Sequence, residues 1–258
     1  MILDAPLAAT SGEFSIGGDL RVRRMGYGTM QLTGHGCWGE PTDLDKAVRV
    51  LRRAVELGVN HIDTADAYGP TVAEDLIRRA LHPYPDGLVV ATKGGMTRQG
   101  PNRWTPVGRA PYLRHCLEMS LRRLGVDTID LYYLHRIDPQ VELAEQVGAL
   151  ALMREEGKIR HIGLSKVTVA QLERAQQITP IAAVQNLFNL AVDRNRAVLD
   201  YCTENRTAFV PYAPLAAGSR SLNPRLALQW LLRQSPVVLP IPGTADLEHL
   251  EANVSAAC

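Results

Sequence analysis

The chain alternates between short apolar segments and longer segments of helical periodicity, and this alternation limits the folds that it can adopt. A first strand is expected to end near Gly28. Further strands are expected at "HID", "GLVVATK", "TIDLYYLH", "IRHIGLS", "IAAVQN", "AFVPYAP" and "VVLPIPG". Helices are expected at roughly 41–58, 71–81, 110–124, 141–157, 168–178, 193–206, 225–234 and 246–256.

Strict alternation of strand and helix predicts a parallel sheet with right-handed crossovers. Strands this short and apolar are typical of strands that are buried on both faces. Eight such units predict closure into a (β/α)8 TIM barrel rather than an open sheet. The stretch "EFSIGGDLRVRRMGYG" adds an N-terminal β-hairpin that turns at Gly17 and Gly18, ahead of the first strand.

The composition fits one barrel domain over residues 1–258, since such a barrel needs about 250 residues. The formal net charge is +1, and no run of five basic residues occurs, which argues against a nucleic-acid partner. The N-terminal "MILDAPLAAT" lacks the features of a signal peptide, and no apolar run approaches a membrane span. A cytoplasmic location is expected.

The cysteines are widely separated in the sequence and form neither a C-x-x-C pair nor a zinc-like spacing. We therefore expect no metal site, and free thiols in a reducing compartment. The four cysteines are Cys37, Cys116, Cys202 and Cys258.

Polar side chains stand where the predicted strands end, and the chemistry of such barrels sits at the carboxyl ends of their strands. These polar residues are Asp63, Tyr68, Lys93, His135, Ser165, Lys166, Gln185, Asn186 and Tyr212. They should all face one mouth of the barrel. Neither a Ser–His nucleophile pair nor a metal cage is indicated.

Four of these residues make a coherent chemical set. The phenol of Tyr68 has an ordinary pKa near 10, and the ammonium of Lys93 would lower that pKa. Asp63 can hold Lys93 in place through an ion pair, and His135 can orient a substrate carbonyl. The set predicts a general acid beside an electrophilic carbonyl. Each residue alone could instead be a cap or a structural salt bridge, so the prediction depends on their convergence.

Several stretches of the sequence resemble the aldo-keto reductases, in the expected order along nearly the whole chain. They are "MGYGTMQL", "GVNHIDTADAYG", "VVATKGG", "IDLYYLHRID", "GKIRHIGLS", "VQNLFN", "VPYAPL" and "IPGTADLEHLEANV". The two ends look most like the bacterial branch that includes pyridoxal reductases. The resemblance implies reduction of an aldehyde or ketone to an alcohol by NAD(P)H. It also implies that Asp63, Tyr68, Lys93 and His135 are the catalytic tetrad, with Tyr68 as the proton donor.

The same resemblance implies a set of cofactor-binding residues. At the nicotinamide end they are Gly28, Thr29, Met30, Asp63, Ser165, Lys166, Gln185 and Tyr212, with the ring of Tyr212 stacked on the nicotinamide. Leu215, Gly218 and Arg220 lie in the loop expected over the pyrophosphate. At the adenosine end they are Pro242, Gly243, Thr244, His249 and Asn253, where the N-terminus of the last helix can offer amides to phosphate.

The chain departs from the family pattern in three places. Lys166 stands where relatives have asparagine; it can donate to the nicotinamide amide or swing outward. Gly243 and His249 stand where several relatives carry Lys and Arg, so NADPH is favoured but NADH is possible. Arg220 could compensate or be an ordinary solvated charge. The barrel also looks somewhat trimmed after strand 7 and at the C-terminus, with a loop from Leu215 to Pro224 that is expected to move.

The substrate pocket is expected to lie among residues that follow strands 1 to 4. They are Met30, Trp38, Tyr68, Trp104 and His135. Trp104 could stack on a flat substrate or pack as part of a surface loop. The nearby basic residues Arg98, Arg103 and Arg109 favour an anionic substrate.

Two other functions remain open at this point. One is a non-catalytic barrel that binds the cofactor and acts as a sensor or subunit. The other is an enzyme that uses the cofactor for a redox-neutral step, which the unusual Lys166 keeps open. The expected partner is a small-molecule carbonyl compound, with neither nucleic acid nor membrane, and the oligomeric state is open.

Overall fold

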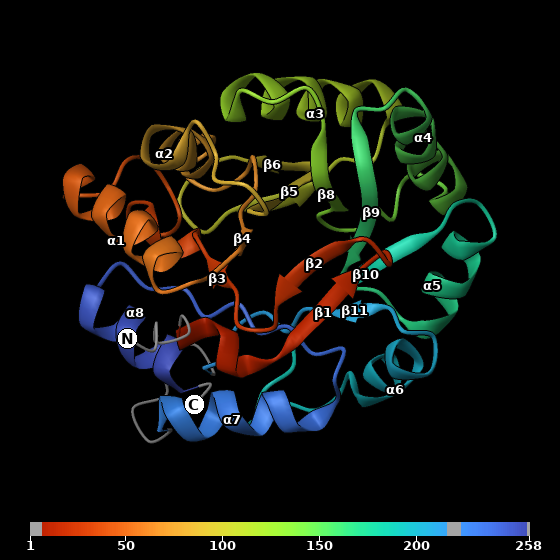
Figure 1. The fold of residues 1–258 in the computed structure, drawn as a ribbon. Helices are drawn as coiled ribbons and strands as arrows, with labels where there is room; N and C mark the ends of the chain where they lie inside the picture. Colours follow the sequence, from red (N-terminus) through yellow and green to blue (C-terminus); the bar gives the residue numbers. More distant parts are fainter. Residues whose placement is uncertain (1–6, 216–222, 257–258) are drawn as a thin grey trace.

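The computed structural model describes residues 7–215 and 223–256, and it forms a curled parallel sheet surrounded by helices (Figure 1). Neighbouring strands run parallel in the order β11-β10-β9-β8-β5-β4-β3. Their bounds are β3 (Tyr27–Gly28), β4 (His61–Asp63), β5 (Val89–Gly94), β8 (Ile129–Leu134), β9 (Ile159–Ser165), β10 (Ile181–Gln185) and β11 (Ala208–Phe209). The predicted (β/α)8 barrel is confirmed.

The eighth expected strand, "VVLPIPG", closes the barrel through scattered hydrogen bonds instead of a regular ladder. On one side the N–H of Leu239 donates to the carbonyl of Phe209 (2.8 Å). On the other side the N–H of Gly26 donates to the carbonyl of Pro240 (2.9 Å). Pro240 and Pro242 have no N–H to donate, so a continuous ladder cannot form here.

The helices lie within three residues of their predicted bounds. They are α1 (Leu44–Glu56), α2 (Val72–Leu81), α3 (Ala110–Leu124), α4 (Leu143–Glu155), α5 (Val169–Gln176), α6 (Arg196–Glu204), α7 (Pro224–Gln234) and α8 (Leu247–Ser255). Their ends follow ordinary capping chemistry. The side chain of Asp43 accepts from Lys46 N ahead of α1, and Gly125 ends α3 in the left-handed conformation.

The predicted N-terminal hairpin consists of β1 (Glu13–Ile16) and β2 (Leu20–Arg23), which pair antiparallel. Gly17 and Gly18 form its turn with φ of 63° and 93°, which favours glycine. The hairpin lies across the barrel in Figure 1. Its buried side chains form one cluster with inward-facing residues such as Leu131 and Leu239. It therefore fills the interior at one end, while the carboxyl ends of the strands point to the other.

A second hairpin was not expected from the sequence. The stretch "TRQGPNRWTPVGR" after β5, in which Trp104 could have been part of a surface loop, overlaps β6 (Met96–Arg98) and β7 (Trp104–Pro106), which pair antiparallel. The many glycine, proline and charged residues of this stretch obscure the short alternation of a strand pair. Its consequence for the site is that Trp104 is held on a strand.

The cysteines agree with the expectation where the structure describes them. Cys37, Cys116 and Cys202 are buried free thiols, while Cys258 lies outside the described residues. Most of the loop from Leu215 to Pro224, which was expected to move, also lies outside them. Over 7–215 and 223–256, every helix is too short or too polar to cross a membrane.

Candidate active site

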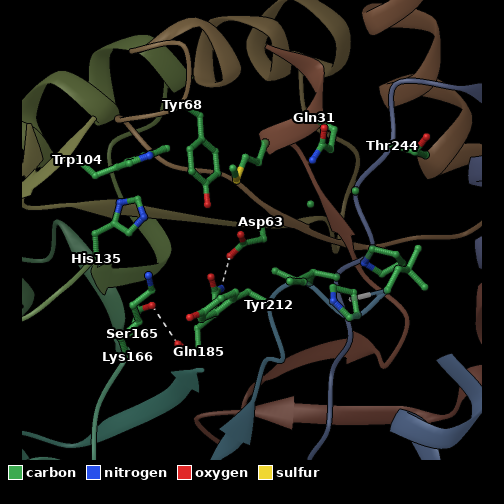
Figure 2. Close-up of a pocket in the computed structure, with 18 of the residues that line it drawn as sticks. Gln31, Asp63, Tyr68, Trp104, His135, Ser165, Lys166, Gln185, Tyr212 and Thr244 are labelled. Atoms are coloured by element: carbon green, nitrogen blue, oxygen red, sulfur yellow. Dashed lines mark hydrogen bonds between the residues drawn. The ribbon is translucent and has the colours of Figure 1, made fainter. Parts of the chain in front are cut away.

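A pocket of about 740 Å³ opens at the carboxyl ends of the barrel strands (Figure 2). It gathers most of the residues that the sequence singled out. The predicted residues that line it are Gly28, Met30, Asp63, Tyr68, Trp104, His135, Ser165, Lys166, Gln185, Tyr212, Leu215, Pro242, Gly243 and Thr244.

A buried ion pair lies at the base of this pocket. Asp63 ends β4 and Lys93 lies near the end of the adjacent β5, so their side chains meet: Lys93 Nζ donates to Asp63 Oδ1 across 2.5 Å. Lys93 also donates to the carbonyl of Thr64 (2.7 Å), and Gln185 Nε2 donates to Asp63 Oδ2 (2.8 Å). Burial lowers the pKa of Lys93, and the charge of Asp63 opposes this shift. Both carboxylate oxygens are therefore occupied by donors.

Tyr68 lies directly above this pair. Its hydroxyl accepts a long hydrogen bond from Lys93 Nζ (3.4 Å), and the ammonium lies 5.1 Å from the centre of the ring. Gly69 makes the turn that positions it, with φ of 105° and no room for a Cβ, which would lie 2.3 Å from Val72. The chain therefore needs glycine directly after this tyrosine.

The expected lowering of the Tyr68 pKa is wrong for this arrangement. Burial raises the pKa of Tyr68 well above 10, and the charge of Asp63 raises it further. Lys93 does not reverse this because Asp63 neutralises it at closer range. Tyr68 is consequently a protonated phenol at neutral pH, with a proton available to give.

Two aromatic rings pack against the ring of Tyr68. Its ring meets Trp104 and His135 edge to face, with centroids 6.3 and 5.8 Å away. Burial and nearby cations, Lys93 first, hold the pKa of His135 well below 6.5, so its imidazole is neutral. Within the described residues, His135 Nδ1 is buried without a hydrogen-bond partner. Because His135 also lines the pocket, its neutral imidazole is placed beside a substrate oxygen bound there.

The opposite wall comes from the ends of β9, β10 and β11. Ser165 Oγ donates to the carbonyl of Gln185 (2.9 Å). Lys166 has a φ of 60°, which is uncommon for a residue with a Cβ, and its N–H donates to the same carbonyl (3.0 Å). Its ammonium lies 5.2 Å from the ring centre of Tyr212. Lys166 therefore lines the pocket and contacts Tyr212. The sequence had left open that its side chain swings outward, and the structure does not show this orientation.

Some predicted residues lie away from the cavity. Thr29 is buried behind the wall, where its hydroxyl donates to Thr64 (2.8 Å). Trp38 is 38% exposed and packs near Arg98 (5.7 Å) instead of lining the pocket. His249 and Asn253 lie on α8, and neither lines the cavity. Gly218 and Arg220 lie outside the described residues.

The N-terminus of α8 was expected to offer its amides to phosphate. In the structure these amides bond within the chain, since the N–H groups of Glu248 and His249 donate to Asp246 Oδ1 (3.0 and 3.3 Å). Lys46 Nζ in turn pairs with Asp246 (3.0 Å). The dipole of α8 therefore faces a carboxylate of its own chain.

Sequence reasoning missed six residues of the lining, which are Gln31, Arg136, Ala213, Pro214, Ile241 and Ala245. Arg136 had a signal, since it follows His135 at the end of a predicted strand. Arg98 was instead assigned to substrate, but its guanidinium donates to the carbonyls of Cys37 (2.7 Å) and Ala67 (2.6 Å). Arg109 pairs with Glu145 (3.8 Å).

Comparisons with known proteins agree with this geometry. The model of the aldo/keto reductase family matches residues 24–225. An uncharacterized oxidoreductase of Schizosaccharomyces pombe is 49% identical over 97% of this chain and 86% of its own length. Pyridoxine 4-dehydrogenase of Escherichia coli is 38% identical over 96% and 93% of the two chains.

Solved structures of oxidoreductases also share the fold of this chain. The glycerol dehydrogenase of Gluconobacter oxydans superposes with a TM-score of 0.86 at 26% identity, covering 95% of this chain and 90% of its own. An aldo-keto reductase of Klebsiella pneumoniae in complex with NADPH has a TM-score of 0.78 at 26% identity, with 95% and 89% covered.

Proposed function

The chain belongs to the aldo/keto reductase family and is an oxidoreductase, and we propose that its pocket reduces the carbonyl group of an aldehyde or ketone with NADPH. The observation that carries this proposal is the contact of Tyr68 with the buried Asp63–Lys93 pair, beside the neutral imidazole of His135. A protonated phenol, an ammonium and a neutral imidazole that lie close together can donate a proton to a carbonyl oxygen and stabilise the charge that develops there during reduction.

Each side chain then has a distinct task. His135 donates a hydrogen bond to the substrate carbonyl and orients it. Tyr68 gives its proton to the carbonyl oxygen as negative charge develops there, and the resulting phenolate is stabilised by Lys93. Asp63 holds Lys93 charged and fixes its position. A nicotinamide held by Ser165, Gln185 and Tyr212 would supply the hydride for the carbonyl carbon.

The proposed cofactor is NADPH, with NADH as the alternative. The pocket extends from Trp104 at one end to Thr244 at the other (Figure 2), and an aldo-keto reductase with the same fold has been solved with NADPH. Ser165, Gln185 and Tyr212 would hold the nicotinamide end. Gly28 and Gly243 would form the floor, where a Cβ on Gly243 would come within 2.6 Å of the carbonyl of Gly28. These assignments support an extended ligand in this pocket.

The test combines cofactor titration with turnover. NADPH and NADH are titrated by quenching of tryptophan fluorescence, and absorbance at 340 nm is then followed over pyridoxal, aromatic aldehydes and keto-sugars. The proposal expects tighter binding of NADPH and its oxidation by at least one carbonyl compound. Binding without oxidation over the whole panel would contradict it and favour a sensor or subunit. A retained cofactor with a product at the same oxidation level as the substrate would favour a redox-neutral step.

A further inference from the structure

Two cations line the pocket without a counter-charge. Arg136 follows His135, and Lys166 follows Ser165, so both stand next to residues at the reacting end of the site. Neither side chain forms an ion pair within residues 7–215 and 223–256. Arg136 Nε is buried there without a hydrogen-bond partner. Burying a donor without a partner is costly, so a group that pairs with it when bound would remove that cost.

Among the described residues that line the pocket, no carboxylate is free to pair with these two cations. Asp63 is the only carboxylate among its described lining residues, and Lys93 and Gln185 already occupy both of its oxygens. The two cations also act on each other. Burial lowers the pKa of Lys166 to about 8, and the charges of Arg136 and Arg194 contribute to that shift. The net field at this wall is therefore positive.

The backbone holds Lys166 in this unfavourable place. Its φ of 60° is fixed by the hydrogen bond from its N–H to the carbonyl of Gln185, and its ammonium lies on the ring of Tyr212. Lys166 is exposed, so its ammonium is accessible to a ligand in the pocket. Backbone strain at a left-handed φ in the wall of a pocket indicates a role in binding.

We propose that the carbonyl substrate carries an anionic group, and that Arg136 and Lys166 bind it. This inference rests on the proposed reduction and names the class of its substrate. Arg136 can offer a planar fork of N–H donors to a carboxylate, and Lys166 can add a point charge from the adjacent strand end. Arg98 and Arg109 bond elsewhere and Arg103 lies on the β6–β7 hairpin, so Arg136 and Lys166 are the cations among the described residues that line the cavity.

The experiment compares two probes of equal shape, 4-formylbenzoate and its neutral amide 4-formylbenzamide. The unaltered protein should have a kcat/KM for the carboxylate at least about tenfold above that for the amide, since charge-assisted hydrogen bonds are much stronger than neutral ones. Arg136→Gln and Lys166→Gln should each lower kcat/KM for the carboxylate by about tenfold and change it little for the amide. Arg174→Gln, at an exposed position of α5, is the matched control and should leave both values unchanged.

Several results would overturn the inference. One is equal use of the two probes by the unaltered protein, and another is an equal loss on both probes in Arg136→Gln and Lys166→Gln. A weaker affinity for NADPH in these variants, with unchanged probe preference, would assign the two cations to the cofactor instead.

A binding arm separates this inference from the proposed reduction. Calorimetry with 4-methylbenzoate and 4-methylbenzamide on the NADPH-loaded protein measures the charge preference without turnover. Tighter binding of the carboxylate, lost in both variants, supports the anion site even if neither aldehyde is reduced. No preference would overturn the inference even if both aldehydes are reduced.

Discussion

Lys93 Nζ and Asp63 Oδ1 lie 2.5 Å apart at the ends of neighbouring strands, and the exposed fractions of their side chains are 1% and 2%. An ion pair so completely removed from water is costly to form and more costly to break, because the remaining charge loses its partner. The barrel therefore contains a buried ion pair that is costly to form and to break, at the position where Lys93 contacts Tyr68.

Removing one partner of this pair should be worse than removing both. Lys93→Met leaves the carboxylate of Asp63 buried beside Gln185 alone, which should lower the free energy of unfolding by about 3–5 kcal/mol. Asp63→Asn combined with Lys93→Met should recover most of that stability. Neither variant should turn over substrate, since the phenolate of Tyr68 loses its ammonium. Urea denaturation and a 340 nm assay measure both quantities. A double variant as unstable as the single one would contradict this account of the pair.

The charge preference of the substrate site should depend on pH through Lys166. Its pKa is lowered to about 8, so Lys166 is charged below that pH and neutral above it. The groups that face it are Arg136 after β8, Arg194 before α6 and the phenol of Tyr212 after β11. The ratio of kcat/KM for 4-formylbenzoate to that for 4-formylbenzamide should fall between pH 7 and 9. A ratio that stays constant in the unaltered protein, or that falls equally in Lys166→Gln, would show that Lys166 is not the titrating group.

Asp66 should make stability depend on pH. Burial, together with the charge of Glu74, raises the pKa of its carboxyl to about 7, from an ordinary value of 3.8. The folded state therefore keeps a proton that the unfolded state has released, and stability is lost as pH rises from about 4 to about 7. Asp66→Asn should remove this loss, on the order of 2 kcal/mol at pH 8 relative to pH 5. Urea denaturation at the two pH values measures it.

Asp127→Asn is the control for that measurement, because the side chain of Asp127 is exposed to water instead of buried. If Asp66→Asn and Asp127→Asn respond to pH in the same way, the buried carboxyl of Asp66 does not control the dependence.

The closure of the barrel leaves no room between its first and last segments. A Cβ on Gly243 would lie 2.6 Å from the carbonyl oxygen of Gly28, so Gly243→Ala should lower the free energy of unfolding by about 1–3 kcal/mol. Gly148→Ala is the matched control. A Cβ there meets nothing within 4 Å on helix α4, and the change should raise stability by about 0.5–1 kcal/mol. Opposite signs in the two variants, measured by thermal denaturation, would support this account; equal effects would count against it.

The elements of the fold could be predicted because their signals are local. The apolar strands and the helical periodicity each depend on a few neighbouring residues. The β6–β7 hairpin and the irregular closure at Pro240 depend on which segments meet in space. Neither could be read from the chain before its fold was known.

The candidate site also combines features that could be predicted from the sequence with features that could not. The convergence of Asp63, Tyr68, Lys93 and His135 follows from their places at strand ends. The direction in which the pKa of Tyr68 shifts does not follow from these places, because it depends on burial and on the distance between Asp63 and Lys93. Arg98 and Arg136 could not be told apart by charge, because hydrogen bonds to distant carbonyls decide which guanidinium faces the pocket.

The most direct test of the central claim is the variant Tyr68→Phe, which removes only the phenolic oxygen. NADPH affinity, measured by fluorescence titration, should change little, because the nicotinamide is assigned to Ser165, Gln185 and Tyr212. Oxidation of NADPH by a carbonyl substrate, followed at 340 nm, should fall by at least about a hundredfold, since general acid catalysis contributes at least that much. Unchanged turnover with unchanged NADPH affinity would contradict the assignment of Tyr68 as the proton donor.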